Sequence, residues 1–180
     1  AALIDRHDDA MEAAARVRAV RTRELTRCAM SDLLGGVDPR GNAIADATDV
    51  AILGALALAQ REETERWGEM RANVVFVAMG RYGGRECSYA SDADVIALHE
   101  AVGGASDTEA AASATAIVNR VKKLLGSATN QLGIVVDLDL RPEGKNGPMS
   151  RTIESHREYA QRWASTWERQ AAVRARPIGE

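Results

Sequence analysis

Two pairs of aspartates, each separated by one residue, are the residues of this chain best suited to chemistry. Asp92 and Asp94 open a strand expected over residues 93–99, and Asp137 and Asp139 lie in one expected over residues 133–140. Residues two apart in a strand point to the same face. Paired carboxylates repel each other unless a cation lies between them. If the two strands are neighbours, three or four carboxylates converge on an oxygen-rich site suited to Mg²⁺.

Gly83 and Gly84 lie between an expected strand and the first acid pair, in a stretch with the composition of a loop, residues 80–91. Glycine allows backbone N–H groups to approach a phosphate closely, and the Ser91 hydroxyl is a further donor. This order suits two-metal phosphoryl transfer, in which one metal activates the attacking hydroxyl and the other holds the triphosphate and the leaving pyrophosphate. Each motif alone is weak and is also typical of a solvated turn; the ordered set is more specific.

The elements that must position these residues follow from hydrophobic periodicity and turn signals. We expect an α+β fold with helices over residues 2–34, 43–67, 107–125 and 152–175, and with strands over residues 74–79, 93–99 and 133–140. Ser106 and Glu109 form a possible capping box for the third helix. The continuous β-branched run at 74–79 is typical of a buried strand. In the last helix, an aromatic stripe at intervals of four is expected to be core: Tyr159, Trp163, Trp167 and Ala171.

Composition restricts the function classes. The 180 residues are 46% hydrophobic and 27% charged with a net charge of −3, which fits a soluble globular protein and argues against a mainly electrostatic nucleic-acid binder. Two distant cysteines imply no disulfide framework and favour a cytoplasmic location. Apolar stretches are interpreted as too short to cross a bilayer, so no membrane partner is expected. The clustered arginines of the first helix are interpreted as a solvated face: Arg16, Arg18, Arg21, Arg23 and Arg27.

Three segments in order, residues 78–94, 136–144 and 166–176, resemble the glutamine synthetase adenylyltransferase family. They include Arg81-Tyr82-Gly83-Gly84, Ser91-Asp92-Ala93-Asp94 and Val136-Asp137-Leu138-Asp139-Leu140-Arg141-Pro142. The resemblance covers residues 73–179 well and implies a polymerase-β-like nucleotidyltransferase fold. It divides the chain into a helical N-terminal region (1–69), a catalytic core (70–150) and a C-terminal helix (151–180) leading to a helical region that the chain lacks.

Family members are bifunctional, with one domain that attaches AMP from ATP to a tyrosine of glutamine synthetase and another that removes it by phosphorolysis. The resemblance implies the C-terminal, adenylylating domain; the adenylyl-removing domain and a non-catalytic nucleotide-binding regulatory domain are the alternatives. It implies ATP as substrate, Mg²⁺, expected as two ions, as cofactor, and glutamine synthetase as protein substrate. A nitrogen-signalling regulatory protein is a further candidate partner.

Carried over residue by residue, the resemblance assigns metal binding and catalysis to Asp92, Asp94 and Asp137. It assigns nucleotide binding to Gly83, Gly84, Ser91 and Arg141. Asp139 departs from the family pattern, because many members carry arginine there. We interpret Asp137 as the metal ligand and Asp139 as a residue behind it, either a fourth acid near the metals or a salt-bridge partner.

Overall fold

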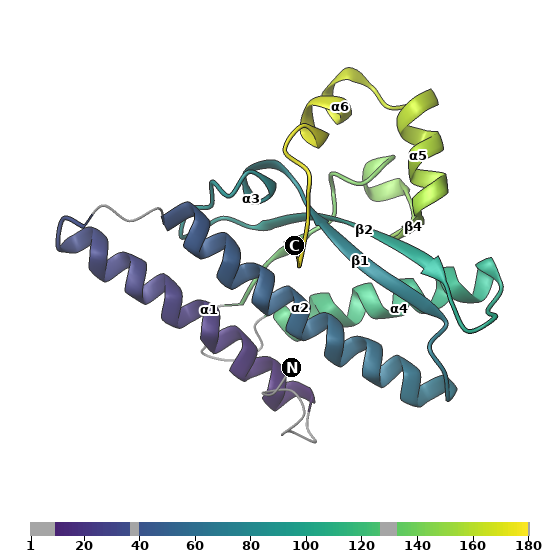
Figure 1. Ribbon diagram of the computed structural model, residues 1–180, viewed down its shortest axis with the longest axis horizontal. Coiled ribbons are helices and arrows are strands. Elements are labelled where there is room, and N and C mark those ends of the chain that lie inside the picture. Colours follow the sequence, from purple (N-terminus) through teal and green to yellow (C-terminus); the bar gives the residue numbers. More distant parts are fainter. Residues whose placement is uncertain (1–9, 37–39, 127–132, 180) are drawn as a thin grey trace.

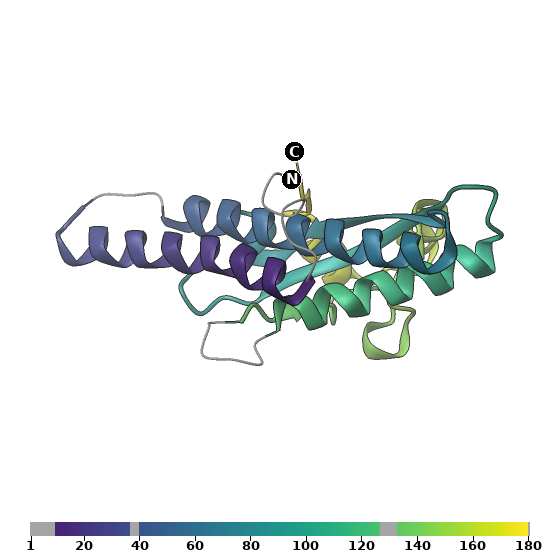
Figure 2. The same ribbon diagram turned by 90° about the horizontal axis from the view of Figure 1, so that it is seen from below.

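A computed structural model describes residues 10–36, 40–126 and 133–179, which form a mixed sheet packed against long helices (Figure 1). Helices α1 (Ala10–Leu33) and α2 (Arg40–Trp67) lie side by side and run in opposite directions. Helix α4 (Asp107–Leu125) packs both on α2 and on the sheet (Figure 2). One apolar cluster, dominated by Ala, Val, Leu and Ile, joins these helices to the sheet.

The sheet has the strand order β3-β2-β1-β5, with β4 as a further partner of β2. Strand β1 (Ala72–Ala78) is antiparallel to β2 (Ala93–Ala101) and to the short β5 (Arg176–Pro177). Strand β2 is parallel to β3 (Val136–Asp137) and, further along, to β4 (Arg151–Thr152). The α+β class is thus confirmed. The chain returns at β5 to the edge of the sheet beside the loop that follows β1.

Strand β1, expected to be a buried strand, is fully buried on one face only. Val74 and Phe76 are buried, whereas Val75 between them is 41% exposed. Strand side chains alternate between the two faces of a sheet, which explains this pattern. Strand β1 also packs against α4.

Helix α4 has the bounds that the sequence predicts. The Ser106 side chain accepts a hydrogen bond from the Glu109 N–H, and the Glu109 carboxylate accepts one from the Ser106 N–H. The predicted capping box is therefore confirmed. One face of this helix is apolar and buried, and it includes Ile117, Val121 and Leu125.

Two elements at the C-terminal side differ from the prediction. The strand expected over residues 133–140 is regular only at Val136–Asp137. The helix expected over residues 152–175 is two helices, α5 (Ile153–Arg162) and α6 (Thr166–Ala172). Residues 163–165 separate them, and Ser165 caps α6 together with Glu168. The expected aromatic core is wrong, because Trp163 is 74% and Trp167 53% exposed.

The first helix begins within the described residues at Ala10, and the predicted residues 2–9 lie outside them. The second predicted helix is confirmed and begins three residues earlier, at Arg40. Contrary to the expectation, α2 is by length and composition long and apolar enough to cross a membrane. However, 67% of the apolar window is buried inside the fold, and the core helix of a globular protein meets the same criterion.

Candidate functional site

Asp94 and Asp137 are brought together by strand pairing. In the parallel register of β2 and β3, Asp94 lies opposite Asp137 and Ala93 lies opposite Val136. The pairing is extended by the Ala93 N–H, which donates to the Val135 carbonyl at 2.8 Å. Asp92 comes directly before β2 and is exposed, whereas Asp94 and Asp137 are half-buried. Two carboxylates from distant segments therefore meet at one edge of the sheet, with a third beside them.

The electrostatics of Asp94 show that the three acids interact. Burial raises the pKa of Asp94, the negative charges of Asp137 and Asp92 raise it further, and the positive charge of Arg81 acts in the opposite direction. Carboxylates that repel one another in a partly dry setting are suited to share a divalent cation. Across residues 10–36, 40–126 and 133–179, no three acidic, histidine or cysteine side chains already share a metal-ligating arrangement. The donor chemistry fits a hard cation, and the side chains would adjust their rotamers around it.

Asp139 does not repeat the arrangement of Asp137, because β3 ends at Asp137 and Asp139 lies in a turn. Its backbone N–H donates to the Asp137 Oδ1 at 2.7 Å. Its carboxylate pairs with the Lys145 Nζ at 3.2 Å and lies 3.8 Å from the Arg141 Nη1. Of the two roles open from the sequence, the structure supports the salt-bridge partner.

The glycine that borders the acids is Gly80, which the sequence analysis did not single out. A Cβ placed on Gly80 would lie 3.2 Å from the Asp94 Oδ2. Gly83 instead faces protein backbone, since a Cβ there would lie 2.1 Å from the Arg174 carbonyl oxygen and 2.6 Å from that of Ala78. A phosphate contact by Gly83 and Gly84 stays a prediction, whereas close chain packing explains Gly83 directly.

Arg141 is buried, and its guanidinium is occupied by the backbone of its own loop. Its Nη1 donates to the Leu138 carbonyl at 2.9 Å, and its Nε and Nη2 donate to the Gly147 and Lys145 carbonyls at 3.2 Å each. These bonds hold the turn that follows Asp137. The predicted phosphate contact of Arg141 stays untested and would require some of these bonds to be exchanged.

Ser91 and Asp92 line a hollow together with Arg21 from α1. The Ser91 hydroxyl accepts the Ser88 N–H at 2.9 Å, which shapes the turn before the acids. Arg21 is buried and its Nε donates to the Thr48 hydroxyl at 3.0 Å. The interpretation of the clustered arginines of the first helix as a solvated face is therefore wrong for Arg21, and also for Arg18, which is 4% exposed. Only tertiary packing brings this cation to the hollow that Asp92 lines.

Replacing Asp94 with asparagine is expected to stabilise the metal-free chain at neutral pH. The pKa of Asp94 is raised by burial and by Asp137 and Asp92. The folded state therefore binds a proton more readily than the unfolded state, and stability falls as the pH rises from the unfolded pKa through the folded pKa. We expect a gain of at most about 1 kcal/mol above that window, because solvent screens a partly exposed charge. Urea unfolding in EDTA at pH 3.5 and pH 7.5 checks this; a gain that is equal at both pH values would contradict it.

The described residues thus form an α+β domain with an acidic edge at the junction of two parallel strands. Residues 1–180 match the model of the family described as glutamate-ammonia ligase adenylyltransferase, and the chain belongs to that family. Adenylyl transfer moves a nucleotide, so the family is one of nucleotidyltransferases.

Curated relatives agree with this placement. The chain is 37% identical to a Streptomyces coelicolor protein over 97% of its own length, 42% identical to one from Cutibacterium acnes over 97%, and 41% identical to one from Bifidobacterium longum over 92%. Each is named bifunctional glutamine synthetase adenylyltransferase/adenylyl-removing enzyme. The matched regions are 19%, 17% and 16% of these proteins, so the chain spans less than a fifth of their length.

Proposed function

We propose that this chain is the adenylylating domain, which transfers AMP from ATP to a tyrosine of glutamine synthetase and so regulates nitrogen assimilation in the cytoplasm. The pairing of Asp94 with Asp137 across β2 and β3 carries the proposal, in a chain that matches the family over residues 1–180. A mixed sheet with acids at the ends of neighbouring strands also supports the finer assignment of a polymerase-β-like fold, with residues 70–150 as its core and the helical segments 1–69 and 151–180 beside it.

In this proposal Asp92, Asp94 and Asp137 hold Mg²⁺, expected as two ions. When bound, Mg²⁺ would screen the carboxylates and polarise the phosphate oxygens of ATP. The chain positions ATP along the loop from Gly80 to Ser91 so that the tyrosine oxygen can attack the α-phosphorus in line. A new P–O bond forms there as the bond to pyrophosphate breaks, and the tyrosine hydroxyl releases its proton to solvent. The protein contributes mainly by positioning and by charge, because it performs no covalent chemistry itself.

The adenylyl-removing reaction is the second candidate, since the names of the relatives carry both activities. It would use the same carboxylates with inorganic phosphate as the attacking group and ADP as the product. A metal-independent nucleotide-binding regulatory domain is the third. The acid pair in register favours a catalytic domain over a regulatory one.

A label-transfer experiment separates the three. The 180-residue chain is incubated with unmodified glutamine synthetase, Mg²⁺ and ATP labelled at the α-phosphate, with and without EDTA. We expect label on the synthetase only with the metal. Release of labelled ADP from adenylylated synthetase, strictly dependent on phosphate, would instead select the removing reaction. ATP binding that is unaffected by EDTA, with neither reaction detected, would select the regulatory domain and refute the proposal.

A further inference from the structure

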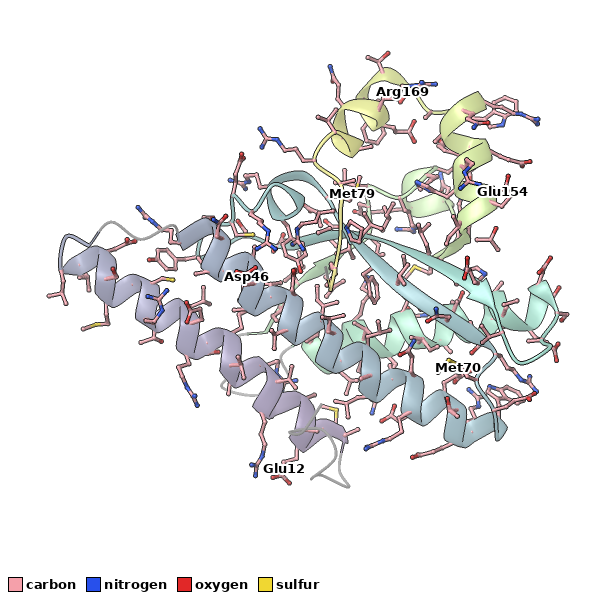
Figure 3. The ribbon with its side chains drawn as sticks, viewed as in Figure 1. Glu12, Asp46, Met70, Met79, Glu154 and Arg169 are labelled. Atoms are coloured by element: carbon pink, nitrogen blue, oxygen red, sulfur yellow. The ribbon has the colours of Figure 1, made fainter. Side chains whose placement is uncertain are left out.

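The loop of residues 80–91 connects β1 to β2, and both of its ends lie at the acidic edge. Gly80 borders the Asp94 carboxylate, and Ser91 directly precedes Asp92. The Met79 N–H, just before the loop, donates to the Asp94 carbonyl at 2.8 Å (Figure 3 labels Met79). The position of this loop therefore determines the surroundings of both acids.

The buried carboxylate of Asp49 on α2 binds a residue of this loop. The Tyr82 hydroxyl donates to the Asp49 Oδ1 at 2.5 Å, and Tyr82 is 1% exposed. Burial and the hydrogen bond to Asp49 raise the pKa of Tyr82, so its hydroxyl stays protonated as a donor. Arg176 on β5 contacts both Asp49 oxygens, with its Nη1 2.7 Å from Oδ2 and its Nη2 3.0 Å from Oδ1. One buried aspartate thus joins α2, the loop and β5.

Two exposed contacts from the same helical pair repeat this pattern. Asp46, one turn before Asp49 on α2 (Figure 3), pairs with Arg85 of the loop. Asp32, at the end of α1, accepts a hydrogen bond from the Tyr89 hydroxyl at 2.6 Å. Each of these aspartates contacts a different residue of the loop. Exposed pairs contribute little to stability, so the buried contact of Asp49 is expected to dominate.

The path from this contact to the acids is short. Tyr82 belongs to the single helical turn α3 (Gly80–Gly83), which also contains Gly80 and Arg81. A Cβ on Gly80 would lie 3.2 Å from the Asp94 Oδ2, and the Arg81 guanidinium is the positive charge that acts on this carboxylate. A shift of Tyr82 would therefore move both the Gly80 backbone and the positive charge of Arg81 relative to Asp94.

We propose that Asp49 and Tyr82 are positioning residues, through which the N-terminal helices hold the loop of residues 80–91 in register with Asp92 and Asp94 for nucleotidyl transfer. The inference rests on the proposed function for its catalytic part. Its structural part, the attachment of the loop to Asp49, is independent of which reaction the chain performs.

The test compares Tyr82→Phe with a matched control, Tyr159→Phe. Tyr159 also donates its hydroxyl to a carboxylate, Glu168 at 2.8 Å, but it joins α5 to α6 away from the loop. Both variants lose one tyrosine–carboxylate hydrogen bond and keep the ring, and the bond lost by Tyr159→Phe is partly buried where that of Tyr82→Phe is buried. In the 180-residue chain we expect only Tyr82→Phe to speed amide exchange of residues 80–83, by about tenfold. It should also lower the kcat of label transfer by about tenfold to a hundredfold, with a smaller change in the KM for ATP.

A second pair of variants tests Asp49 itself. Asp49→Asn is compared with Glu62→Gln, which removes a carboxylate on the same helix that receives two bonds from Arg120 at 2.5 and 2.6 Å. Asp49→Asn should speed loop exchange, and adding Tyr82→Phe to it should change the exchange little further, because both residues act through one contact. Glu62→Gln should leave the loop unaffected.

The outcomes separate the two proposals. Loop exchange and kcat that are the same in the Tyr82 and Tyr159 variants would overturn the positioning role. Faster loop exchange with unchanged kcat in an active chain would also overturn it, since the contact would then be structural only. If the unmodified chain transfers no label, the proposed function fails, and loop exchange alone decides the attachment to Asp49.

Discussion

Replacing Asp94 with asparagine is expected to reduce AMP transfer to glutamine synthetase by at least about 10³-fold, because it removes one of the carboxylates that would hold the metal. The register places this side chain directly opposite Asp137 and next to the exposed Asp92. An asparagine keeps the shape and one oxygen but lacks the charge. The loss should therefore appear in the metal dependence of the rate, and the fold should be retained or stabilised.

Asp139→Asn is the matched control for this prediction. Asp139 lies two residues after Asp137, but its carboxylate pairs with Lys145 and Arg141 rather than with the other acids. Its backbone N–H, which contacts Asp137, is unchanged by the substitution. Label transfer over a range of Mg²⁺ concentrations should show near-normal rates for Asp139→Asn. Equal losses in both variants would indicate that Asp139 is a fourth metal ligand, and full activity of Asp94→Asn would refute the site.

The opposite signs expected for stability and activity at Asp94 have one cause. Burial of the Asp94 carboxylate, together with the like charges of Asp137 and Asp92, destabilises the metal-free fold, and the same group of charges attracts a divalent cation. Substitution of a residue that serves only the fold would lower the stability of the protein. A gain in stability with a loss of transfer would thus indicate a side chain retained for binding.

Features encoded by neighbouring residues could be predicted from the sequence. Helix α4 has its capping box and its apolar stripe within one segment, and its bounds were predicted correctly. The broken C-terminal helix carried a similar signal, because Ser165 and Glu168 have the same spacing as Ser106 and Glu109. The regular spacing of Trp163 and Trp167 predicts one continuous helix, and this prediction is wrong because a new helix begins after Ser165.

Features that depend on pairing between distant segments could be predicted only in part. The alternation of Val136, Leu138 and Leu140 is typical of a strand, yet β3 ends at Asp137 because the turn held by Arg141 begins there. The meeting of Asp94 with Asp137 required an assumption about neighbouring strands. Asp49 lies in no motif, and only the folded chain brings it to Tyr82 and Arg176. Sequence patterns thus identified the acids but not the residues that hold the loop beside them.

Gly83→Ala is expected to destabilise the fold by about 3 kcal/mol or more, because backbone atoms leave no room for a methyl group. The added Cβ would lie 2.1 Å from the Arg174 carbonyl oxygen and 2.6 Å from that of Ala78, and neither can rotate away. For a chain of this size such a loss lowers the Tm by about 6–12 °C. Thermal unfolding followed by circular dichroism measures it.

Gly84→Ala separates this packing role from nucleotide binding. A Cβ on Gly84 would meet the Arg174 Cδ at 3.1 Å, part of a flexible side chain that can move, so we expect a loss below about 1 kcal/mol. If the loop binds phosphate through its backbone, Gly84→Ala should weaken ATP binding while the Tm stays nearly unchanged. A Tm for Gly83→Ala equal to that of the unmodified chain would show that the C-terminal segment does not pack on the loop as described, and it would remove the packing explanation for this glycine.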